Sequence, residues 1–332
     1  EVAAAEGLNP QPREHLDICS LLGIPAGLVA LTKCDLVSEE LLDLARLEVE
    51  ELLGDSPFSG APIIATSSTT GKGLEELQAA LLQLAEDHHA EPDPATPARL
   101  PIDRAFHLKG LGVVVTGTLV SGTIHSGESL QILPGSGSAR VRSIQVHGQS
   151  RQEAAVGERT ALQLTGTSLG ELLRGMQLTA PGVFEAGNCM VGRMTLLPDA
   201  AKPIKGSTPI RLHLYSSEVV GRLRPLEGRP LAPGPAGLVD IRLAHRVVAV
   251  RGDGYINRRP APPPPRGGGD ILDPHWRRRR GAPRAAALRA LDGDLEATLL
   301  QWVADAGEAG VETAEIAHRL GLIEERVTDH LL

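Results

Sequence analysis

Aromatic residues are scarce in this sequence, where Phe, Trp and Tyr together make up 2% of 332 residues. The hydrophobic cores must therefore consist of aliphatic side chains, chiefly Leu, Val and Ala. Cysteine is equally scarce. The three cysteines, Cys19, Cys34 and Cys189, are far apart, odd in number and without the spacing of a metal site. This usage is typical of a reducing cytosol, so we expect a cytoplasmic protein.

Long apolar runs and a secretory signal are absent as well. Without an apolar run of about 18 residues, neither membrane spanning nor export is indicated, and no membrane partner is expected. A net charge of −8 excludes a uniformly basic coat for nucleic acid, so any contact with RNA must be local. The chain begins with Glu1, Val2–Ala5 resembles the end of a buried strand, and a helical pattern continues to Leu332. We therefore expect an internal fragment of a longer protein.

Strands and helices alternate in the first quarter of the sequence. Strands are predicted over Gly27–Leu31 and Pro62–Thr66. Helices are predicted over Pro12–Leu22, Ser38–Leu53 and Gly73–Leu84. In the second helix Ser38 is the expected N-cap, and the expected apolar face consists of Leu41, Leu44, Ala45, Leu47 and Leu52. The alternation predicts half of a doubly wound α/β domain.

Two polar motifs follow consecutive strands of this region: Thr32-Lys33-Cys34-Asp35 and Ser67-Ser68-Thr69-Thr70-Gly71. A carboxylate such as Asp35 can accept from both N1–H and N2–H of guanine, and the Lys33 stem can lie against the base. Ser67 and Ser68 can support the second loop and present a backbone N–H to guanine O6. Either motif alone is also compatible with a helix-capping turn. Together, at consecutive strand ends, they favour a guanine pocket formed by Thr32, Lys33, Asp35, Ser67 and Ser68.

The middle of the chain has the pattern of two small β-barrels. Arg99–Gly122 alternates branched apolar and polar residues and predicts a hairpin. Further strands of a first barrel are predicted over Glu128–Leu133, Arg140–Val146 and Arg159–Leu164. Those of a second barrel are predicted over Cys189–Leu197, Pro209–Tyr215, Glu218–Leu223, Gly237–Leu243 and Val247–Val250. The segment Arg258–Gly269, with its proline run Pro262–Pro265, is not expected to form a central strand.

The C-terminal part combines a basic run with a helical pattern. Trp276 precedes four arginines, Arg277–Arg280, which suit either contact with RNA phosphates or a solvated linker. Helices are predicted over Leu295–Ala306, Ala314–Leu320 and Ile323–Leu332. Their arrangement is that of a helix-turn-helix, although many glutamates make this one acidic.

Several of these segments resemble translational GTPases: Pro10–Leu16, Thr32–Asp35, Ser67–Gly71 and Asp103–Gly122. Leu100–Arg104, Lys109–Thr118 and Ile144–Gly148 resemble more closely the bacterial selenocysteine-specific elongation factors, the SelB family. The resemblance implies a multidomain α/β plus β fold. Its parts are a partial P-loop-type GTPase domain (1–87), a linker (88–98), two elongation-factor-type β-barrels (99–182 and 183–260), a second linker (261–283) and the start of a winged-helix arm (284–332).

The same resemblance implies the function of the intact protein. A family member is a monomer that binds GTP with Mg2+ and delivers selenocysteyl-tRNA to the ribosome at recoded UGA codons. Further winged-helix units recognise a hairpin in the selenoprotein mRNA. This sequence, however, lacks the glycine-rich phosphate loop and both switch segments of the family, and Gly71-Lys72-Gly73 does not replace them. GTP hydrolysis by this chain alone is therefore not expected.

The resemblance also suggests where the tRNA binds. Asp103, Arg104 and Arg159 match the family's pocket for the selenocysteyl group, where two guanidinium groups can hold a selenolate. Arg211, Arg222 and Arg224 are candidates for contact with tRNA phosphates. A surface ion pair remains the alternative for Asp103 with an arginine. For the whole chain, the alternatives are another translational GTPase of the elongation factor Tu type or a non-catalytic tRNA-binding module.

Overall fold

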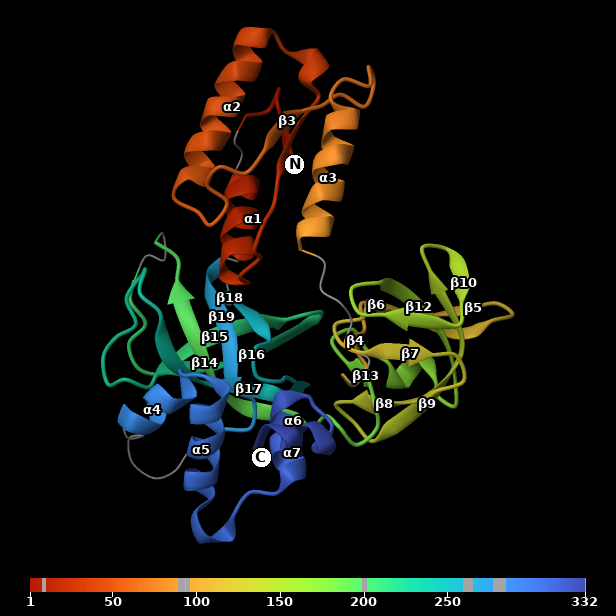
Figure 1. The fold of residues 1–332 in the computed structure, drawn as a ribbon, viewed down its shortest axis with the longest axis vertical. Coiled ribbons are helices and arrows are strands. Elements are labelled where there is room, and N and C mark those ends of the chain that lie inside the picture. The colour runs from red at the N-terminus through yellow and green to blue at the C-terminus, as the bar shows by residue number, and fades with distance from the viewer. Residues whose placement is uncertain are drawn as a thin grey trace. The chain divides into compact units, whose positions relative to one another are not determined.

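A computed structural model describes residues 1–7, 10–88, 93, 96–198, 202–258, 265–276 and 285–331. The chain divides into two compact units, Glu1–Glu91 and Pro92–Leu332, and each is described by itself (Figure 1). Within the described residues, no helix combines the length and apolar character needed to span a membrane. The basic run 277–280 and the prolines 262–264 lie outside the described residues.

The first unit is a three-stranded parallel sheet with the strand order β1-β2-β3. Its strands are β1 (Val2–Ala3), β2 (Val29–Thr32) and β3 (Ile63–Ala65). Its helices are α1 (Pro10–Leu21), α2 (Glu39–Gly54) and α3 (Leu74–Asp87), with a short 3-10 turn, η1 (Cys34–Leu36), after β2. In Figure 1, α1 and α2 lie on one side of the strands and α3 on the other. The predicted α/β alternation is thus confirmed.

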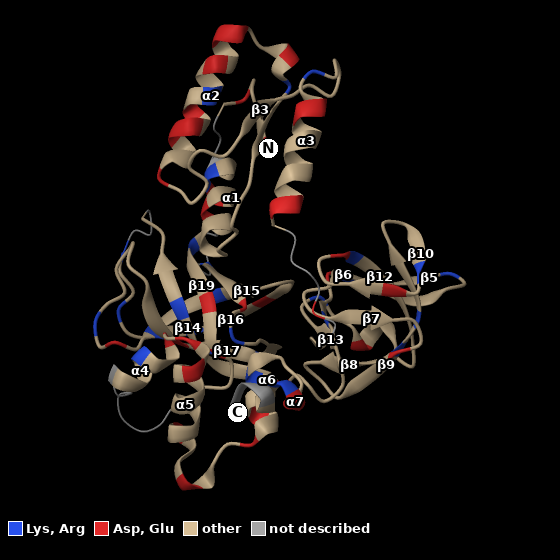
Figure 2. Ribbon diagram, in the orientation of Figure 1, with Lys and Arg blue, Asp and Glu red and all other residues tan. Residues whose placement is uncertain are grey.

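Helix α2 begins as predicted but packs through a different face. The Ser38 hydroxyl accepts a hydrogen bond from the Leu41 N–H, which caps the helix. The buried residues are Leu42, Ala45, Val49 and Leu53. Leu41, Leu44 and Leu47 are instead more than half exposed. The prediction was right for Ala45 but wrong for these three leucines, because apolar residues occur on more than one side of this helix and the side that includes Val49 packs in the core of the unit. Asp and Glu recur along α2 and at the start of α3 (Figure 2).

The first barrel contains an eight-stranded sheet. Its strand path is β4 (Arg99–Pro101), β13 (Gln177–Thr179), β8 (Ser129–Leu133), β9 (Gly137–Val146), β12 (Arg159–Thr165), β6 (Gly112–Thr118) and β5 (Arg104–Leu108), with β10 (Gln149–Arg151) paired to β9. Strands β7 (Thr123–His125) and β11 (Glu153–Ala155) form a separate pair, and η2 (Leu169–Glu171) is a 3-10 turn. The core is aliphatic, as the composition predicts.

The second barrel is closed by six strands. In order they are β14 (Ala186–Leu196), β17 (Gly237–Val248), β16 (Ser217–Pro225), β15 (Thr208–Leu214), β18 (Gly254–Arg258) and β19 (Pro265–Asp273). Two predicted strands, Gly237–Leu243 and Val247–Val250, are thus replaced by the single strand β17, which runs on to Val248 and forms a bulge opposite Asn188.

Strand β19 lies within the segment 261–283, which was predicted to be a linker. That prediction was wrong for β19, and the second barrel does not end at residue 260 as predicted. Strand β19 pairs with both β14 and β18 and so closes the barrel. The glycines of β19 are what the pairing requires, because a Cβ on Gly269 would lie 2.1 Å from the Arg193 carbonyl oxygen. Pro265, the one described proline of the run, is the first residue of the strand, where no ladder hydrogen bond is lost.

The C-terminal helices pack on the outside of the second barrel. They are α4 (Ala285–Leu291), α5 (Leu295–Ala306), α6 (Thr313–Leu320) and α7 (Glu324–Leu331), with a 3-10 turn, η3 (Gly307–Ala309), after α5. Val191, Leu238 and Leu272 of the barrel share one apolar cluster with Leu299, Trp302, Ile316 and Val327 of the helices. The helices therefore form an arm that is fixed to the barrel by burial of apolar surface.

Candidate functional site

The two predicted guanine-binding loops meet at one edge of the first unit's sheet. Strands β2 and β3 are parallel, and Leu31 is opposite Ala65. The Cys34 N–H donates to the Thr66 carbonyl over 3.2 Å, and the Thr66 N–H donates to the Leu31 carbonyl over 2.7 Å. Ligands of open α/β sheets bind at this carboxyl end of the strands. The loops are therefore held side by side where a base would bind.

Lys33 lies at the start of the first loop with a left-handed backbone (φ 58°). Its ammonium group forms an ion pair with Glu6, with 2.8 Å between Nζ and Oε1, and both side chains are about half exposed. The hydrogen bond from Lys33 lowers the pKa of Glu6, and the same bond raises the pKa of Lys33. The sequence analysis did not identify Glu6. Its signal was an acidic residue just after the first strand, because that strand ends at the same edge of the sheet as β2 and β3.

The second loop is shaped by Ser67 and Gly73. Ser67 is 1% exposed, and its hydroxyl accepts a hydrogen bond from the Thr70 N–H over 3.1 Å. A Cβ on Gly73, whose φ is +72°, would lie 2.0 Å from the Ala65 carbonyl oxygen, so only glycine permits this approach of α3 to β3. Ser68 is exposed at the tip of the loop. Ser67 therefore supports the turn, and Ser68 faces solvent.

Of the remaining residues of the first loop, Thr32 supports the sheet and Asp35 is exposed. The Thr32 hydroxyl donates to the Val2 carbonyl over 3.4 Å and so joins β1 to β2. Asp35 lies in η1 with an exposed side chain, and its carboxylate has no hydrogen-bond partner within the described residues. An exposed carboxylate beside an exposed loop tip fits the hydrogen-bonding edge of guanine.

The fit does not extend to the phosphates or to magnesium. The sequence contains no glycine-rich phosphate loop, and within the described residues no group of three or more His, Cys, Asp or Glu side chains could hold a metal ion. We therefore derive no step of phosphate chemistry from this chain.

In the first barrel, Asp103, Arg104 and Arg159 come together around β6. Arg104 is opposite Thr116, and Arg159 is opposite Thr118, so the two arginines are on the strands that flank β6. The Asp103 N–H donates to the Thr116 carbonyl over 2.8 Å. Nη1 of Arg159 lies 3.0 Å from Oδ2 of Asp103, and the Arg159 side chain is 59% exposed. Asp103 and Arg159 thus form an ion pair that is open to solvent, and Arg104, next to Asp103 in the chain, is exposed.

The three arginines predicted on the second barrel each have a partner within the chain. Arg211 of β15 forms an ion pair with Glu218, and Arg222 of β16 donates to the hydroxyl and carbonyl of Ser207. Arg224 lies 3.6 Å from the buried carboxylate of Asp240. The sequence reasoning missed Arg242, which is exposed and directly opposite Arg222. Its signal was an arginine between two apolar residues, Ile241 and Leu243, and its Nε lies 3.4 Å from Oδ1 of Asp240.

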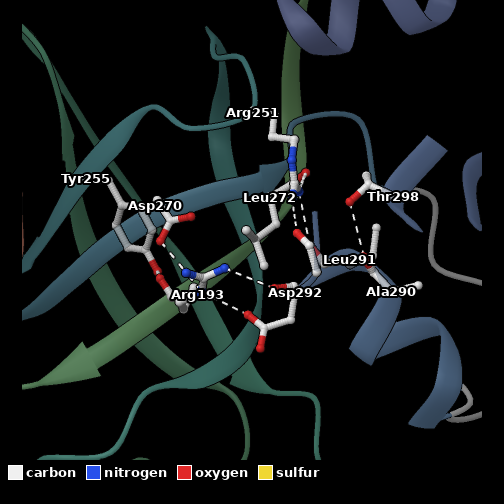
Figure 3. A network of polar contacts seen from close by, with 10 residues as sticks. Arg193, Arg251, Tyr255, Asp270, Leu272, Ala290, Leu291, Asp292 and Thr298 are labelled. Carbon is white, nitrogen blue, oxygen red and sulfur yellow. Dashed lines mark hydrogen bonds and ion pairs between the residues drawn. The ribbon is translucent and has the colours of Figure 1, made fainter. Parts of the chain in front are cut away.

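A polar network joins the second barrel to α4 (Figure 3). The Arg251 guanidinium donates to the carbonyls of Leu272 and Leu291 over 3.0 Å each. Arg193 of β14 donates to a carboxylate oxygen of Asp292 over 2.8 Å, and Tyr255 donates to the Arg193 carbonyl. Because Leu291 ends α4, Arg251 caps the carbonyl end of that helix. The network holds the start of the arm against the barrel.

Three family descriptions match consecutive parts of the chain. Residues 2–87 match the elongation factor Tu GTP-binding domain, and residues 112–179 match elongation factor Tu domain 2. Residues 191–278 match the β-barrel domain of selenocysteine-specific elongation factor. The selenocysteine-specific elongation factor of Desulfomicrobium baculatum is 40% identical over 318 residues, which cover 95% of this chain and 50% of that protein. The chain belongs to the family of selenocysteine-specific elongation factors.

Other members of the family agree. The selenocysteine-specific elongation factor of Escherichia coli K12 is 37% identical over 227 residues, covering 68% of this chain and 36% of that protein. The crystal structure of bacterial selenocysteine-specific elongation factor EF-Sec superposes with a TM-score of 0.82 at 26% identity, covering 97% of this chain and 52% of that one. The chain therefore spans about half or less of the length of the curated relatives described here.

Proposed function

We propose that this chain carries the guanine-recognition edge and the tRNA-binding barrels of a selenocysteine-specific elongation factor. The proposed activity of the whole protein is GTP-dependent delivery of selenocysteyl-tRNA to the ribosome at recoded UGA codons. The observation that carries this proposal is the ion pair of Asp103 with Arg159 beside Arg104, on the solvent-facing side of the first barrel. By their resemblance to the family's motifs, these three residues correspond to its pocket for the selenocysteyl group.

The chemistry of that site favours a selenolate over a hydroxyl. A selenol is ionised near neutral pH, so the guanidinium groups of Arg104 and Arg159 can form charge-assisted hydrogen bonds with it. A neutral serine hydroxyl gains much less from the same groups. Asp103 orients Arg159, and such an exposed pair contributes under about 1 kcal/mol to folding. Loss of the pair would therefore affect ligand recognition far more than stability if the proposal holds.

The other sites have supporting roles in the proposal. Asp35 and the Ser68 loop would hold the guanine base, with the Lys33 stem against its face. GTP and Mg2+ are proposed as ligands of the whole protein, and no contact with the phosphates or the metal is assigned to residues of this chain. Arg211, Arg222 and Arg224 would contact tRNA phosphates. Each arginine would then either leave its present partner within the chain or bind that partner and a phosphate together. The mRNA hairpin would be bound by winged-helix units beyond those described here.

Discrimination between selenocysteyl-tRNA and seryl-tRNA on the same tRNA body tests the proposal. The chain should prefer the selenocysteyl form, and Arg159→Ala should reduce that preference by about tenfold or more, the value of one or two charge-assisted hydrogen bonds. Arg151→Ala is the matched control, because Arg151 is an exposed arginine of the same barrel on β10. Equal binding of both tRNAs by the folded chain would contradict the proposal and favour a general translational GTPase.

A further inference from the structure

A cavity of about 240 Å³ lies between the end of β19 and the helices α5 and α6. None of its lining residues is among those assigned to guanine or tRNA. Its walls include two indole rings, three carboxylates and one guanidinium group, which belong to Trp276, Trp302, Asp273, Asp305, Glu315 and Arg319. At about 30 Å³ for each water-sized group, the cavity has room for a small organic molecule or the end of a long side chain.

The aromatic wall already holds one cation. The guanidinium carbon of Arg319 lies 4.9 Å from the ring centre of Trp302, which is 2% exposed. Attraction between a cation and an aromatic face is strongest for tryptophan and increases where water is excluded. Arg319 also binds Asp273 over 2.9 Å and Glu315 over 2.6 Å. These contacts show that the walls stabilise a buried guanidinium by both indole and carboxylate groups.

The charge of the lining is not balanced by this arginine. With three carboxylates and one guanidinium group, the described lining has a formal charge of −2. Asp305 is half-buried and forms no ion pair within the described residues. The Nε–H of Arg319 is a buried donor without a hydrogen-bond partner in the described chain. Among the residues that the structure describes, the lining therefore keeps both an unpaired negative charge and an unused donor.

We propose that this cavity binds an organic cation, an ammonium or guanidinium group carried by a free amine or by a basic side chain of a protein. Asp305 is the carboxylate that pairs with the ligand, and Trp276 supplies an aromatic face that no described cation occupies. The unused donor of Arg319 suits a ligand that also carries a carbonyl acceptor. This site does not depend on the proposed function of the barrels.

Intrinsic fluorescence tests the proposal with unusual selectivity, because Trp276 and Trp302 are the two tryptophans of the chain and both line the cavity. The chain is titrated with putrescine, with agmatine and with N-acetylarginine amide, and with 1,4-butanediol as the uncharged counterpart. We expect a saturable change in tryptophan emission with the cations and none with the diol. Tighter binding of N-acetylarginine amide than of agmatine identifies a protein side chain as the ligand, and the reverse identifies a free amine.

Variants of α5 locate the site. Asp305→Asn should weaken binding by about fivefold or more, the range expected for a lost charge partner at a partly desolvated site. Glu296→Gln is the control, because Glu296 is an exposed carboxylate of the same helix outside the cavity. Circular dichroism of each variant checks that the arm remains folded. An unsaturable response, an equal response to the diol, or unchanged affinity in folded Asp305→Asn would overturn the proposal.

Discussion

His275 follows the last strand of the second barrel and faces several charged groups. Its backbone N–H donates to Asp273 over 3.0 Å, and its Nε2 is buried without a hydrogen-bond partner in the described chain. The charged or titratable groups around it are those of Glu185, Glu315, His318 and Arg319. Burial is the main cause that lowers the pKa of the His275 imidazole from its ordinary value near 6.5. The ring is therefore neutral in the folded protein at pH values where the unfolded chain takes up a proton.

This shift predicts a loss of stability in mild acid. Neutral His275 contributes fully to the free energy of unfolding above pH 6.5, and this contribution is lost as the pH falls below that value. The free energy of unfolding then falls by up to about 1.4 kcal/mol per pH unit for one proton. His275→Gln should reduce that slope, measured by urea unfolding over about pH 5 to 8, a range that extends at least one unit on either side of the unfolded pKa. His125→Gln, at a side chain 60% exposed, is the control. An unchanged slope in His275→Gln would assign the acid sensitivity to other groups, such as His213.

At the scale of single residues, the sequence best predicted which segments lie near each other. The loop with Asp35 lies beside the loop with Ser68, as the positions of their strands required. Asp103 likewise lies beside Arg159. Glu6 was missed because its partner Lys33 is 27 residues away and no short-range pattern links them. Arg242 was missed because cross-strand register sets its position opposite Arg222, and register follows from pairing over long distances.

At the level of elements, the α/β alternation and the short strands of the barrels were predictable from periodicity and turn residues. Two features were not. Strand β19 was hidden by its glycines and its initial proline, which are turn signals locally and close-packing residues in the barrel. The buried face of α2 was ambiguous, because leucines occur on several faces and only contact with the sheet decides between them.

The corrected face of α2 makes a direct prediction. Leu42 is 8% exposed, whereas its neighbour Leu41 is 54% exposed. Leu42→Ala should destabilise the first unit by about 2–5 kcal/mol, because it removes buried methyl groups and leaves a cavity. Leu41→Ala, the same change one position away, should cost under about 0.5 kcal/mol. Hydrogen exchange of peptides from β2 and β3, measured by mass spectrometry, compares the two variants. We expect faster exchange in Leu42→Ala than in Leu41→Ala, and equally fast exchange in both would contradict the observed face.

Across the whole second unit, the order of domains was predictable but the contacts between them were not. Arg99 and Asp253 are 154 residues apart in sequence, and both are 4% exposed. Arg99 Nη1 and Nη2 each lie 2.7 Å from a different oxygen of Asp253, to which Tyr215 also donates. Burial and Asp253 both raise the pKa of the Tyr215 hydroxyl, so it remains a donor. This buried pair joins β4 of the first barrel to the turn before β18 of the second.

The pair predicts a large cost for losing one partner and a smaller one for losing both. Arg99→Met should destabilise the unit by about 3–5 kcal/mol, because it leaves the Asp253 carboxylate buried and unpaired. Arg99→Met with Asp253→Leu should recover much of that loss, since an apolar pair needs no desolvation of charge. Urea unfolding followed by tryptophan emission measures both. The guanidinium carbon of Arg99 also lies 5.7 Å from the ring centre of Phe184 and 5.2 Å from that of Tyr215. If the double variant is as unstable as the single one, this packing holds the barrels together, and the ion pair does not.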